Sequence, residues 1–347
     1  MSKYLIYFIV FLSLFLRLFW IQKVPPSLNW DEVSIGYNAY SILKTGKDEW
    51  GAKMPLIFRA YGDYKLPAYV YLTVPFVGVL GFNDISVRLL SVLAGVLGVY
   101  FTFLLTNELL KLGEFGIDEK WCKRISLLSS FLVAVEPWTF FIGRIALEAN
   151  LALTLFILGF YLFLKGLSNP KLMLLSSAFW GLTIWTYNAY RVFTPLFLVS
   201  IFLIFKNEIK RAFKSRTKLL LGTLALIFVF IIPMFFQLLN SSGQARYDKV
   251  GIIDAGAVGQ IINLRKKFGV TTSISRILFN RPTYFTAKFL GNFVSHFNPN
   301  FLFIEGGKHY QFSAPGRGIL YLIDLPLMLL GFYFILKRRS RIGYILL

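Results

Sequence analysis

Long apolar segments dominate this chain and restrict it to folds that pack within a lipid bilayer. A helix needs about 20 mostly apolar residues to cross the hydrocarbon core of a membrane. Hydrophobic residues make up 56% of the chain and charged residues only 16%, against about 45–50% and about 25% in soluble domains. The sequence predicts about eight spanning helices, at residues 4–21, 86–107, 125–142, 151–165, 171–187, 191–205, 219–239 and 319–336.

We therefore expect an all-α polytopic membrane protein in which residues 1–347 form one membrane domain. Two long connections, residues 22–84 and 240–318, separate the predicted spans. The chain ends in residues 342–347, which read as the first apolar residues of a ninth, incomplete span. We therefore expect it to be truncated at its C-terminus.

Positive charges orient the predicted spans. The formal net charge is +20, which in a soluble protein would suggest nucleic acid. Here the richest basic connections are KNEIKRAFKSRTK at 206–218 and KRRSR at 337–341, and alternation of the spans places both on the side of the N-terminus. Cytoplasmic loops of membrane proteins are enriched in Lys and Arg. We expect a cytoplasmic N-terminus, both long connections outside, and no nucleic-acid partner.

The apolar stretch 66–82 is the exception to this pattern. LPAYVYLTVPFVGVLGF is short and is interrupted by Pro75. A spanning helix here would invert every later connection and place KNEIKRAFKSRTK outside, against the positive-inside rule. The sequence therefore predicts an interfacial or re-entrant helix on the outer side.

The first long outer connection contains a short predicted helix with two acids in its first turn. Asn29 suits the N-cap and Gly46 the C-terminal glycine, and apolar residues recur between them at helical spacing: Trp30, Val33, Tyr37, Tyr40 and Leu43. Asp31 and Glu32 occupy the first turn. They either complement the helix dipole or serve as a general base or metal ligands at the membrane surface.

A lysine follows in the same connection. Lys65 comes directly after Asp63 and Tyr64 and directly before the predicted interfacial helix. It either lies at the interface as a snorkelling lysine or meets a lipid phosphate at headgroup depth.

Two shorter outer connections also carry charges. Arg144 and Glu148 lie four residues apart in GRIALEANL, so we expect them to share a helix face as an ion pair or as part of a site. Arg191 follows Tyr187 in TYNAYRVFTP. Ionisable residues at membrane depth are functional candidates by default. Arg17 and Arg88 are less informative, because both could simply snorkel.

These segments resemble the bacterial membrane glycosyltransferases of the GT-C superfamily, in particular the protein-mannosyltransferase and aminoarabinose-transferase-like enzymes. The resemblance covers almost the whole chain and rests on four segments in order: NWDEVSIGYNAYSILKTGKDEWG, FRAYGDYKLPAYVYLTVP, RIALEANLAL and TYNAYRVFTPL. One departure is that the family often has two prolines after its lysine, whereas Lys65 is followed by Leu66 and Pro67.

The resemblance implies transfer of a sugar from a polyprenyl-phosphate donor to an acceptor hydroxyl at the outer face of the plasma (inner) membrane. The acid pair maps onto Asp31 and Glu32 as catalytic residues, and the phosphate-binding lysine maps onto Lys65. The motif of the second outer connection maps onto Arg144 and Glu148. Arg191 is a further expected phosphate ligand, and Tyr64, Asp63 and Tyr187 are expected to support the site.

Whether a metal takes part stays open at this stage. Asp31 and Glu148 would be the ligands of Mg²⁺ or Mn²⁺, whose preferred ligands are oxygens. Expected partners are the lipid-linked sugar, membrane lipids and an acceptor that the sequence does not identify. The alternative function is a transporter or lipid flippase, which would place charges near the midplane on broken helices of symmetric halves.

Overall fold

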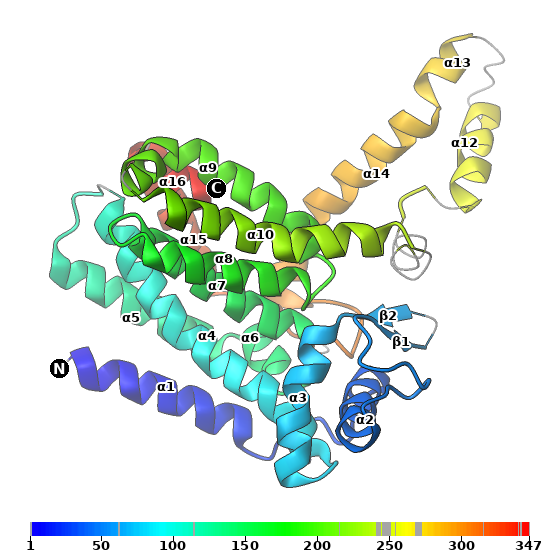
Figure 1. Ribbon diagram of the computed structural model, residues 1–347. Coiled ribbons are helices and arrows are strands. Elements are labelled where there is room, and N and C mark those ends of the chain that lie inside the picture. The colour runs from blue at the N-terminus through cyan, green and yellow to red at the C-terminus, as the bar shows by residue number, and fades with distance from the viewer. Residues whose placement is uncertain are drawn as a thin grey trace.

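The computed structural model describes residues 2–61, 63–113, 115–214, 216–240, 244, 251–253, 255–267, 273–314, 316–338, 340 and 342–346. These residues form a helical bundle with an outer layer of short helices at one end (Figure 1). The helices of the first half are α1 (Ser2–Leu18), α2 (Trp30–Thr45), α3 (Pro67–Leu80), α4 (Asp84–Leu112), α5 (Glu119–Val135), α6 (Pro137–Ile142) and α7 (Glu148–Gly166). Those of the second half are α8 (Lys171–Ile184), α9 (Tyr190–Phe213), α10 (Thr217–Leu238), α12 (Ala255–Lys267), α13 (Ser273–Leu278), α14 (Arg281–Ser295), a π-helical turn (Asn300–Ile304), α15 (Asp324–Arg338) and α16 (Gly343–Leu346).

The predicted all-α membrane class is confirmed. Each segment predicted to span contains a helix, and four of the described helices are long and apolar enough to cross a membrane, namely α4, α7, α9 and α10. The other expected spans contain α1, α5, α8 and α15, which have 14 to 17 residues. Strands in the described part of the chain are limited to β1 (Phe58–Ala60) and β2 (Asp63–Lys65), an antiparallel pair.

The span predicted at 125–142 is wrong in its extent. Helix α5 ends at Val135, and α6 starts after Glu136, whose φ of −48° and ψ of 135° are not helical. Pro137 causes the break, because a proline drives the residue before it out of the helical region. Pro137 itself is well placed at the first position of α6, where its missing N–H has no helical partner to lose. The span predicted at 319–336 likewise becomes helical only at Asp324.

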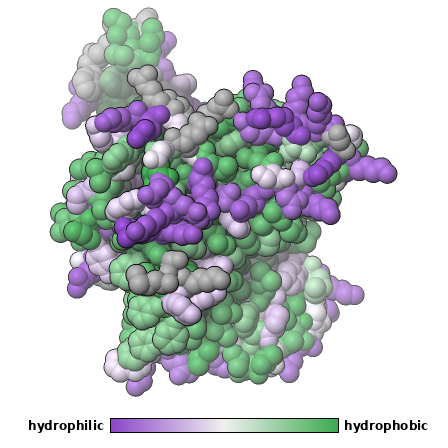
Figure 2. Space-filling model, turned by 90° about the vertical axis from the view of Figure 1, so that its left-hand side faces the viewer, coloured by the Kyte–Doolittle hydropathy of each residue, from purple (hydrophilic) through white to green (hydrophobic). Residues whose placement is uncertain are grey.

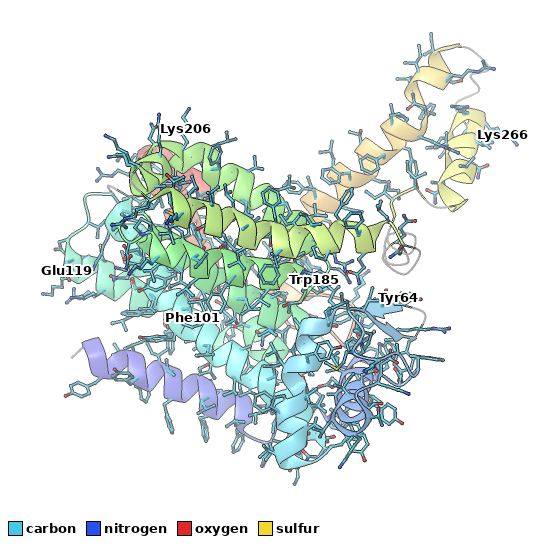
Figure 3. The ribbon with its side chains drawn as sticks, viewed as in Figure 1. Tyr64, Phe101, Glu119, Trp185, Lys206 and Lys266 are labelled. Atoms are coloured by element: carbon cyan, nitrogen blue, oxygen red, sulfur yellow. The ribbon has the colours of Figure 1, made fainter. Side chains whose placement is uncertain are left out.

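The two predicted sets of connections lie at opposite ends of the bundle. Figure 3 shows Glu119 and Lys206 at one end and Tyr64 and Trp185 at the other. Figure 2 looks onto the first of these ends, where hydrophilic side chains gather among apolar ones. The exposed Lys206, near the C-terminal end of α9, lies at this end. The relative sidedness of the connections therefore matches the prediction.

Helix α3 lies across the bundle rather than along it (Figure 1). It has 14 residues, which at 1.5 Å per residue span roughly 20 Å, less than the hydrocarbon core of a bilayer. Pro67 occupies its first turn and Leu66 is its extended N-cap, so a single proline is enough to start the helix. Ala68 N donates to the Trp185 carbonyl at 3.1 Å and thereby joins α3 to the end of α8.

Hydroxyl groups and glycines hold the central helices close together. Thr154 Oγ1 on α7 donates to the Ala94 carbonyl on α4 at 2.8 Å, and Ser176 Oγ on α8 donates to the Gly159 carbonyl on α7 at 2.7 Å. A Cβ added at Gly159 would lie only 2.6 Å from the Trp180 ring. Small residues and interhelical hydrogen bonds are the usual means of helix packing in membranes. The result is a closely packed α4–α7–α8 unit, and the candidate site lies at one end of it.

Candidate functional site

The predicted helix at the start of the first outer connection is confirmed as α2. Asn29 is its N-cap: its side chain accepts from Glu32 N at 3.0 Å, and the Glu32 carboxylate accepts from Asn29 N at 3.0 Å. This reciprocal capping box fixes the first turn. Gly46 ends the helix in the left-handed conformation at φ 67°, which only glycine adopts without strain. Asp31 and Glu32 are adjacent in this fixed turn and therefore point in different directions.

Asp31 meets charges from two other parts of the chain. Lys65, at the end of β2, places its Nζ 2.7 Å from Asp31 Oδ1 and 3.3 Å from Glu148 Oε1. Glu148 is the first residue of α7. The three side chains remain 10–17% exposed, so the cluster borders solvent. Three segments that the sequence singled out separately thus converge on one ammonium group.

The surroundings of Lys65 keep it charged. Burial lowers the pKa of its ammonium, but the carboxylates of Glu148 and Asp31 raise it by more, and the pKa ends above its ordinary value. Lys65 therefore carries a fixed positive charge across the physiological pH range, beside two acidic side chains.

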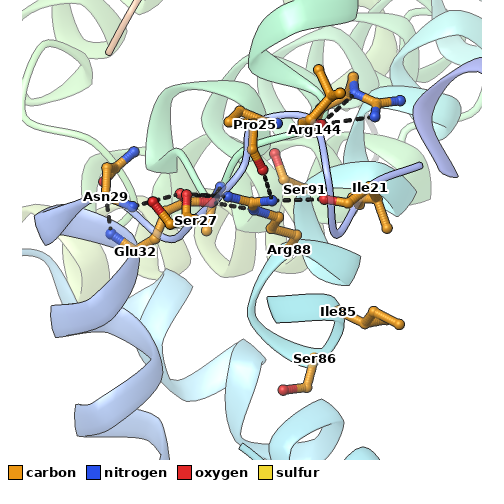
Figure 4. Close-up of polar contacts among 12 residues, drawn as sticks. Ile21, Pro25, Ser27, Asn29, Glu32, Ile85, Ser86, Arg88, Ser91 and Arg144 are labelled. Carbon is orange, nitrogen blue, oxygen red and sulfur yellow. Dashed lines mark hydrogen bonds and ion pairs between the residues drawn. The ribbon is translucent and has the colours of Figure 1, made fainter. Parts of the chain in front are cut away.

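Glu32 is buried beneath this cluster rather than exposed in it. Its carboxylate is 1% exposed and forms an ion pair with Arg88 of α4 at 2.8 Å. Glu32 Oε1 also accepts from Ala146 N at 2.9 Å, two residues before Glu148. Figure 4 shows the carboxylate in this network. One carboxylate therefore ties the start of α2 to α4 and to the segment that leads into α7.

The arginines beside this network bind main-chain carbonyls. The Arg88 guanidinium, wholly buried, donates to the carbonyls of the chain between α1 and α2: Ile21 at 2.6 Å, Pro25 at 3.0 Å and Ser27 at 2.7 Å. Arg17 is also buried and donates to the Ala134 carbonyl at 3.1 Å. The interpretation that Arg17 and Arg88 simply snorkel is therefore wrong. Both guanidinium groups donate to carbonyl acceptors inside the protein and therefore remain buried.

Arg144 and Glu148 do not share a helix face, so that expectation is wrong. Helix α7 begins at Glu148, and Arg144 lies in the irregular segment before it. Its guanidinium donates to the carbonyls of Leu16 at 2.6 Å and Val24 at 2.8 Å. Among the described residues no ion pair joins Arg144 to an acid. Burial and the nearby charge of Arg88 lower the pKa of Arg144.

The remaining expected residues lie at the same end of the bundle as the cluster. Asp63 and Tyr64 precede Lys65 in β2, with Tyr64 opposite Arg59 of β1. Tyr187 lies in the turn between α8 and α9, where its ring is 6.5 Å from that of Tyr190. Their positions are compatible with support of the site.

Arg191 begins a separate polar chain. It is 8% exposed and donates to Gln237 of α10 at 2.5 Å, and Gln237 donates to the Leu56 carbonyl at 3.3 Å. Arg191 thus braces the first outer connection against the bundle. Within the described chain it makes no ion pair with Asp31 or Glu148.

Sequence reasoning missed Gln311, which lies in the second outer connection. Its Nε2 donates to Asp31 Oδ2 at 2.7 Å and to Asn29 Oδ1 at 3.2 Å, and the residue is 4% exposed. Next to it, His309 stacks on Phe312 and meets Trp30 edge-on, with ring centroids 4.9 and 6.5 Å apart. We call residues 309–313 the cap. A lone glutamine 280 residues from its partner leaves no periodic signal in a sequence.

The apolar stripe of α2 faces outward. Trp30, Val33, Tyr37, Tyr40 and Leu43 are each 37–49% exposed, whereas the opposite face, with Ile35 and Ala39, is buried in the core. An exposed apolar face suits a helix at the surface of a membrane.

A metal would have to compete with Lys65. Asp31 and Glu148 are the candidate ligands, and the ammonium already stands between them at 2.7 and 3.3 Å. The described residues contain no group of three or more His, Cys, Asp or Glu side chains suited to a metal ion. In this structure Lys65 is the positive group between the two carboxylates.

The buried ion pair gives a first testable prediction. Glu32→Gln keeps the shape of the side chain but leaves the Arg88 charge without its carboxylate. Removing one partner of a buried pair costs about 3–5 kcal/mol, so we expect a large drop in the thermal unfolding temperature of the protein in detergent micelles.

Glu119→Gln is the matched control, because Glu119 pairs with Lys123 at 2.8 Å on the exposed surface of α5. An exposed pair is worth about 0–1 kcal/mol. Equal unfolding temperatures for the two variants would show that Glu32 does not hold the fold together.

The fold resembles solved membrane glycosyltransferases. The oligosaccharyltransferase of Archaeoglobus fulgidus, in a complex with Zn and sulfate, superposes with a TM-score of 0.56 and 16% identity over 99% of this chain. The oligosaccharyltransferase AglB from the same archaeon, in complex with an inhibitory peptide and a dolichol-phosphate, gives a TM-score of 0.55 at 17% identity. ArnT from Cupriavidus metallidurans aligns over 71% of the chain with a TM-score of 0.47 and 16% identity.

This chain spans less than half the length of the two archaeal structures, 44% and 46%. No family model matches the sequence, and no curated protein matches it either. The structural likeness covers nearly the whole chain and confirms the expected fold, an all-α polytopic membrane protein whose helices are arranged like those of the archaeal oligosaccharyltransferase.

Proposed function

We propose that this chain is a membrane glycosyltransferase that moves a sugar from a polyprenyl-phosphate donor to an acceptor hydroxyl. The observation that carries the proposal is the Lys65 ammonium held between Asp31 and Glu148 at one end of the bundle. A base and a cation lie side by side there, as transfer from a lipid phosphate requires. The likeness to an oligosaccharyltransferase solved in complex with a dolichol-phosphate, a lipid phosphate of the same class, supports this donor.

Asp31 is the proposed general base. The acceptor hydroxyl attacks the anomeric carbon of the sugar and gives its proton to the Asp31 carboxylate. The bond between that carbon and the phosphate oxygen breaks, and polyprenyl phosphate leaves with the electron pair. A single displacement of this kind inverts the anomeric centre. Asp31 is suited to the role because its side chain is 17% exposed, whereas that of Glu32 is 1% exposed.

Lys65 is the proposed ligand of the leaving phosphate. The phosphate gains negative charge as the glycosidic bond breaks, and a fixed cation stabilises that charge best where bulk water is limited. Arg191 is a second candidate, because its Nε is buried without a hydrogen-bond partner among the described residues. Arg144 is better assigned to structure, since carbonyl groups already occupy its guanidinium. Glu148 orients Lys65 from the side opposite Asp31.

The site faces the outside of the plasma membrane in this proposal. The basic connections lie at the other end of the bundle, as Figure 3 shows for Lys206, and the positive-inside rule assigns that end to the cytoplasm. The acids of the site therefore gather at the outer surface rather than at the bilayer midplane, where a transporter would place them.

Asp31→Asn tests the base. The amide keeps the size of the side chain and one acceptor oxygen for Lys65 or Gln311, but it accepts no proton. Turnover of a polyprenyl-phosphate sugar should therefore fall by about 10²–10⁴-fold. The measurement is single-turnover release of polyprenyl phosphate by the purified protein in nanodiscs. Asp84→Asn, at the first turn of α4, is the control and should keep its rate. Near-native turnover by folded Asp31→Asn protein would contradict the assignment.

Gln311→Leu tests the positioning of that base. Leucine fills similar space without donating to Asp31 Oδ2, and losing a hydrogen bond to a charged group costs about 1.5–3 kcal/mol. We expect kcat to fall by about 10–100-fold, with a smaller change in the KM for the donor. The control is Gln22→Leu, since Gln22 is an exposed amide between α1 and α2. A change confined to the donor KM would instead make Gln311 a donor-binding residue.

A chelator tests whether Lys65 replaces a metal. Because the ammonium already stands between the two carboxylates, turnover should persist after dialysis against EDTA and should not rise on adding Mg²⁺ or Mn²⁺. Activity that is lost with EDTA and restored by either ion would mean that a cation displaces Lys65 from Asp31 and Glu148.

A further inference from the structure

The segment from α12 to α14 stands away from the rest of the bundle (Figure 1). Helix α14 carries Phe285, Phe289 and Phe293 at four-residue spacing, and Phe297 follows one turn later. Neighbouring ring centroids are 6.0, 6.5 and 5.3 Å apart along this row. The four rings are 43–62% exposed. An exposed row of four aromatic rings is typical of a surface that contacts a membrane or a partner protein.

The same segment is strongly basic. Residues 255–297 contain no Asp or Glu and six basic residues, namely Arg265, Lys266, Lys267, Arg276, Arg281 and Lys288. Further exposed apolar side chains accompany them on the two shorter helices: Ile262 on α12 and Ile274, Ile277 and Leu278 on α13. Apolar side chains beside a cluster of Lys and Arg are typical of elements that bind an anionic lipid surface.

Internal contacts make the three helices one unit, which we call the arm (residues 255–297). Arg265 Nε on α12 donates to the Phe279 carbonyl at 2.7 Å, and Tyr284 Oη on α14 donates to Gln260 Oε1 at 2.8 Å. Asn280 caps α14 by accepting from Thr283 N at 2.9 Å. The arm is thus braced on the side of α12, and its phenylalanine row is left uncovered.

The arm lies at the end of the bundle where the outer surface of the membrane is expected. Lys266 extends on the same side as Tyr64 and Trp185 and away from Lys206 and Glu119 (Figure 3). The long helices α9 and α10 present apolar, largely uncovered surfaces, with only 17% and 11% of their apolar windows buried. These two helices therefore present apolar surface that is suited to contact with lipid.

We propose that the arm is a membrane-docking element: the phenylalanine row of α14 enters the outer leaflet, and the basic residues of the arm bind anionic lipid headgroups. The lack of any acid in the arm favours a negatively charged bilayer as the occupant of this face. The rings lie among the acyl chains, and the Lys and Arg side chains reach the phosphates. This contact does not depend on the proposed transferase activity.

Site-directed spin labelling tests the proposal on the full chain. Cys122 is the single, buried cysteine, so a Cys122→Ser background leaves only an introduced label. Labels are placed at Phe289→Cys on the row and at Ala287→Cys on the opposite side of α14. The protein is reconstituted into phosphatidylcholine vesicles with and without phosphatidylglycerol, and collision rates with oxygen and with a water-soluble nickel chelate are measured.

With phosphatidylglycerol present, we expect the oxygen-to-nickel accessibility ratio at position 289 to exceed that at position 287 several-fold. Replacing Lys266 and Lys267 with Gln, which leaves the Arg265 contact with the Phe279 carbonyl in place, should reduce this difference. Equal, water-like ratios at both positions in every vesicle would overturn the proposal. So would protection of position 289 that persists in detergent and rises with protein concentration, because a second copy of the chain would then cover the row.

Discussion

The buried ion pair between Glu32 and Arg88 is the interaction on which the candidate site depends. Each partner is almost wholly buried, and a buried charge is tolerated only when its partner and hydrogen bonds are in place. Glu32 caps its own helix, pairs with α4 and holds Ala146 N. The residue before it, Asp31, and the residue two beyond Ala146, Glu148, are thereby fixed at the positions where Lys65 meets them.

Buried arginines provide hydrogen-bond donors for main-chain carbonyls at the ends of helices. Carbonyls at a helix end have no helical partner, and near lipid they cannot rely on water. Arg17, Arg88 and Arg144 use their multiple donors to satisfy such carbonyls around the ends of α1 and α5. Some of the basic residues behind the net charge of +20 therefore join segments inside the protein. Others lie in the connections and orient the protein in the membrane.

Interactions between residues close together in the sequence were predictable, whereas interactions between distant residues were not. Capping by Asn29 and Gly46 is local, so the bounds of α2 were predictable from spacing. Lys65 and Glu148 were found because charges beside apolar spans stand out. Arg88 and Gln311 were not, because their roles depend on partners 56 and 280 residues away. The distinction between Asp31 and Glu32 also required the fold, since adjacent acids in a first turn look alike until one of them is buried.

The second outer connection contains both the cap, which contacts Asp31, and the arm, which we propose binds the membrane. The positions of these two parts are therefore related. Gln311 reaches Asp31 from a segment that continues back through the π-helical turn to α14, and Leu320 N fixes that turn by donating to the Leu302 carbonyl at 2.8 Å. A helix held in the lipid headgroups would restrict the chain that carries the cap. Because a lipid-linked donor also arrives at headgroup depth, the same surface would then present the donor and set the position of the cap.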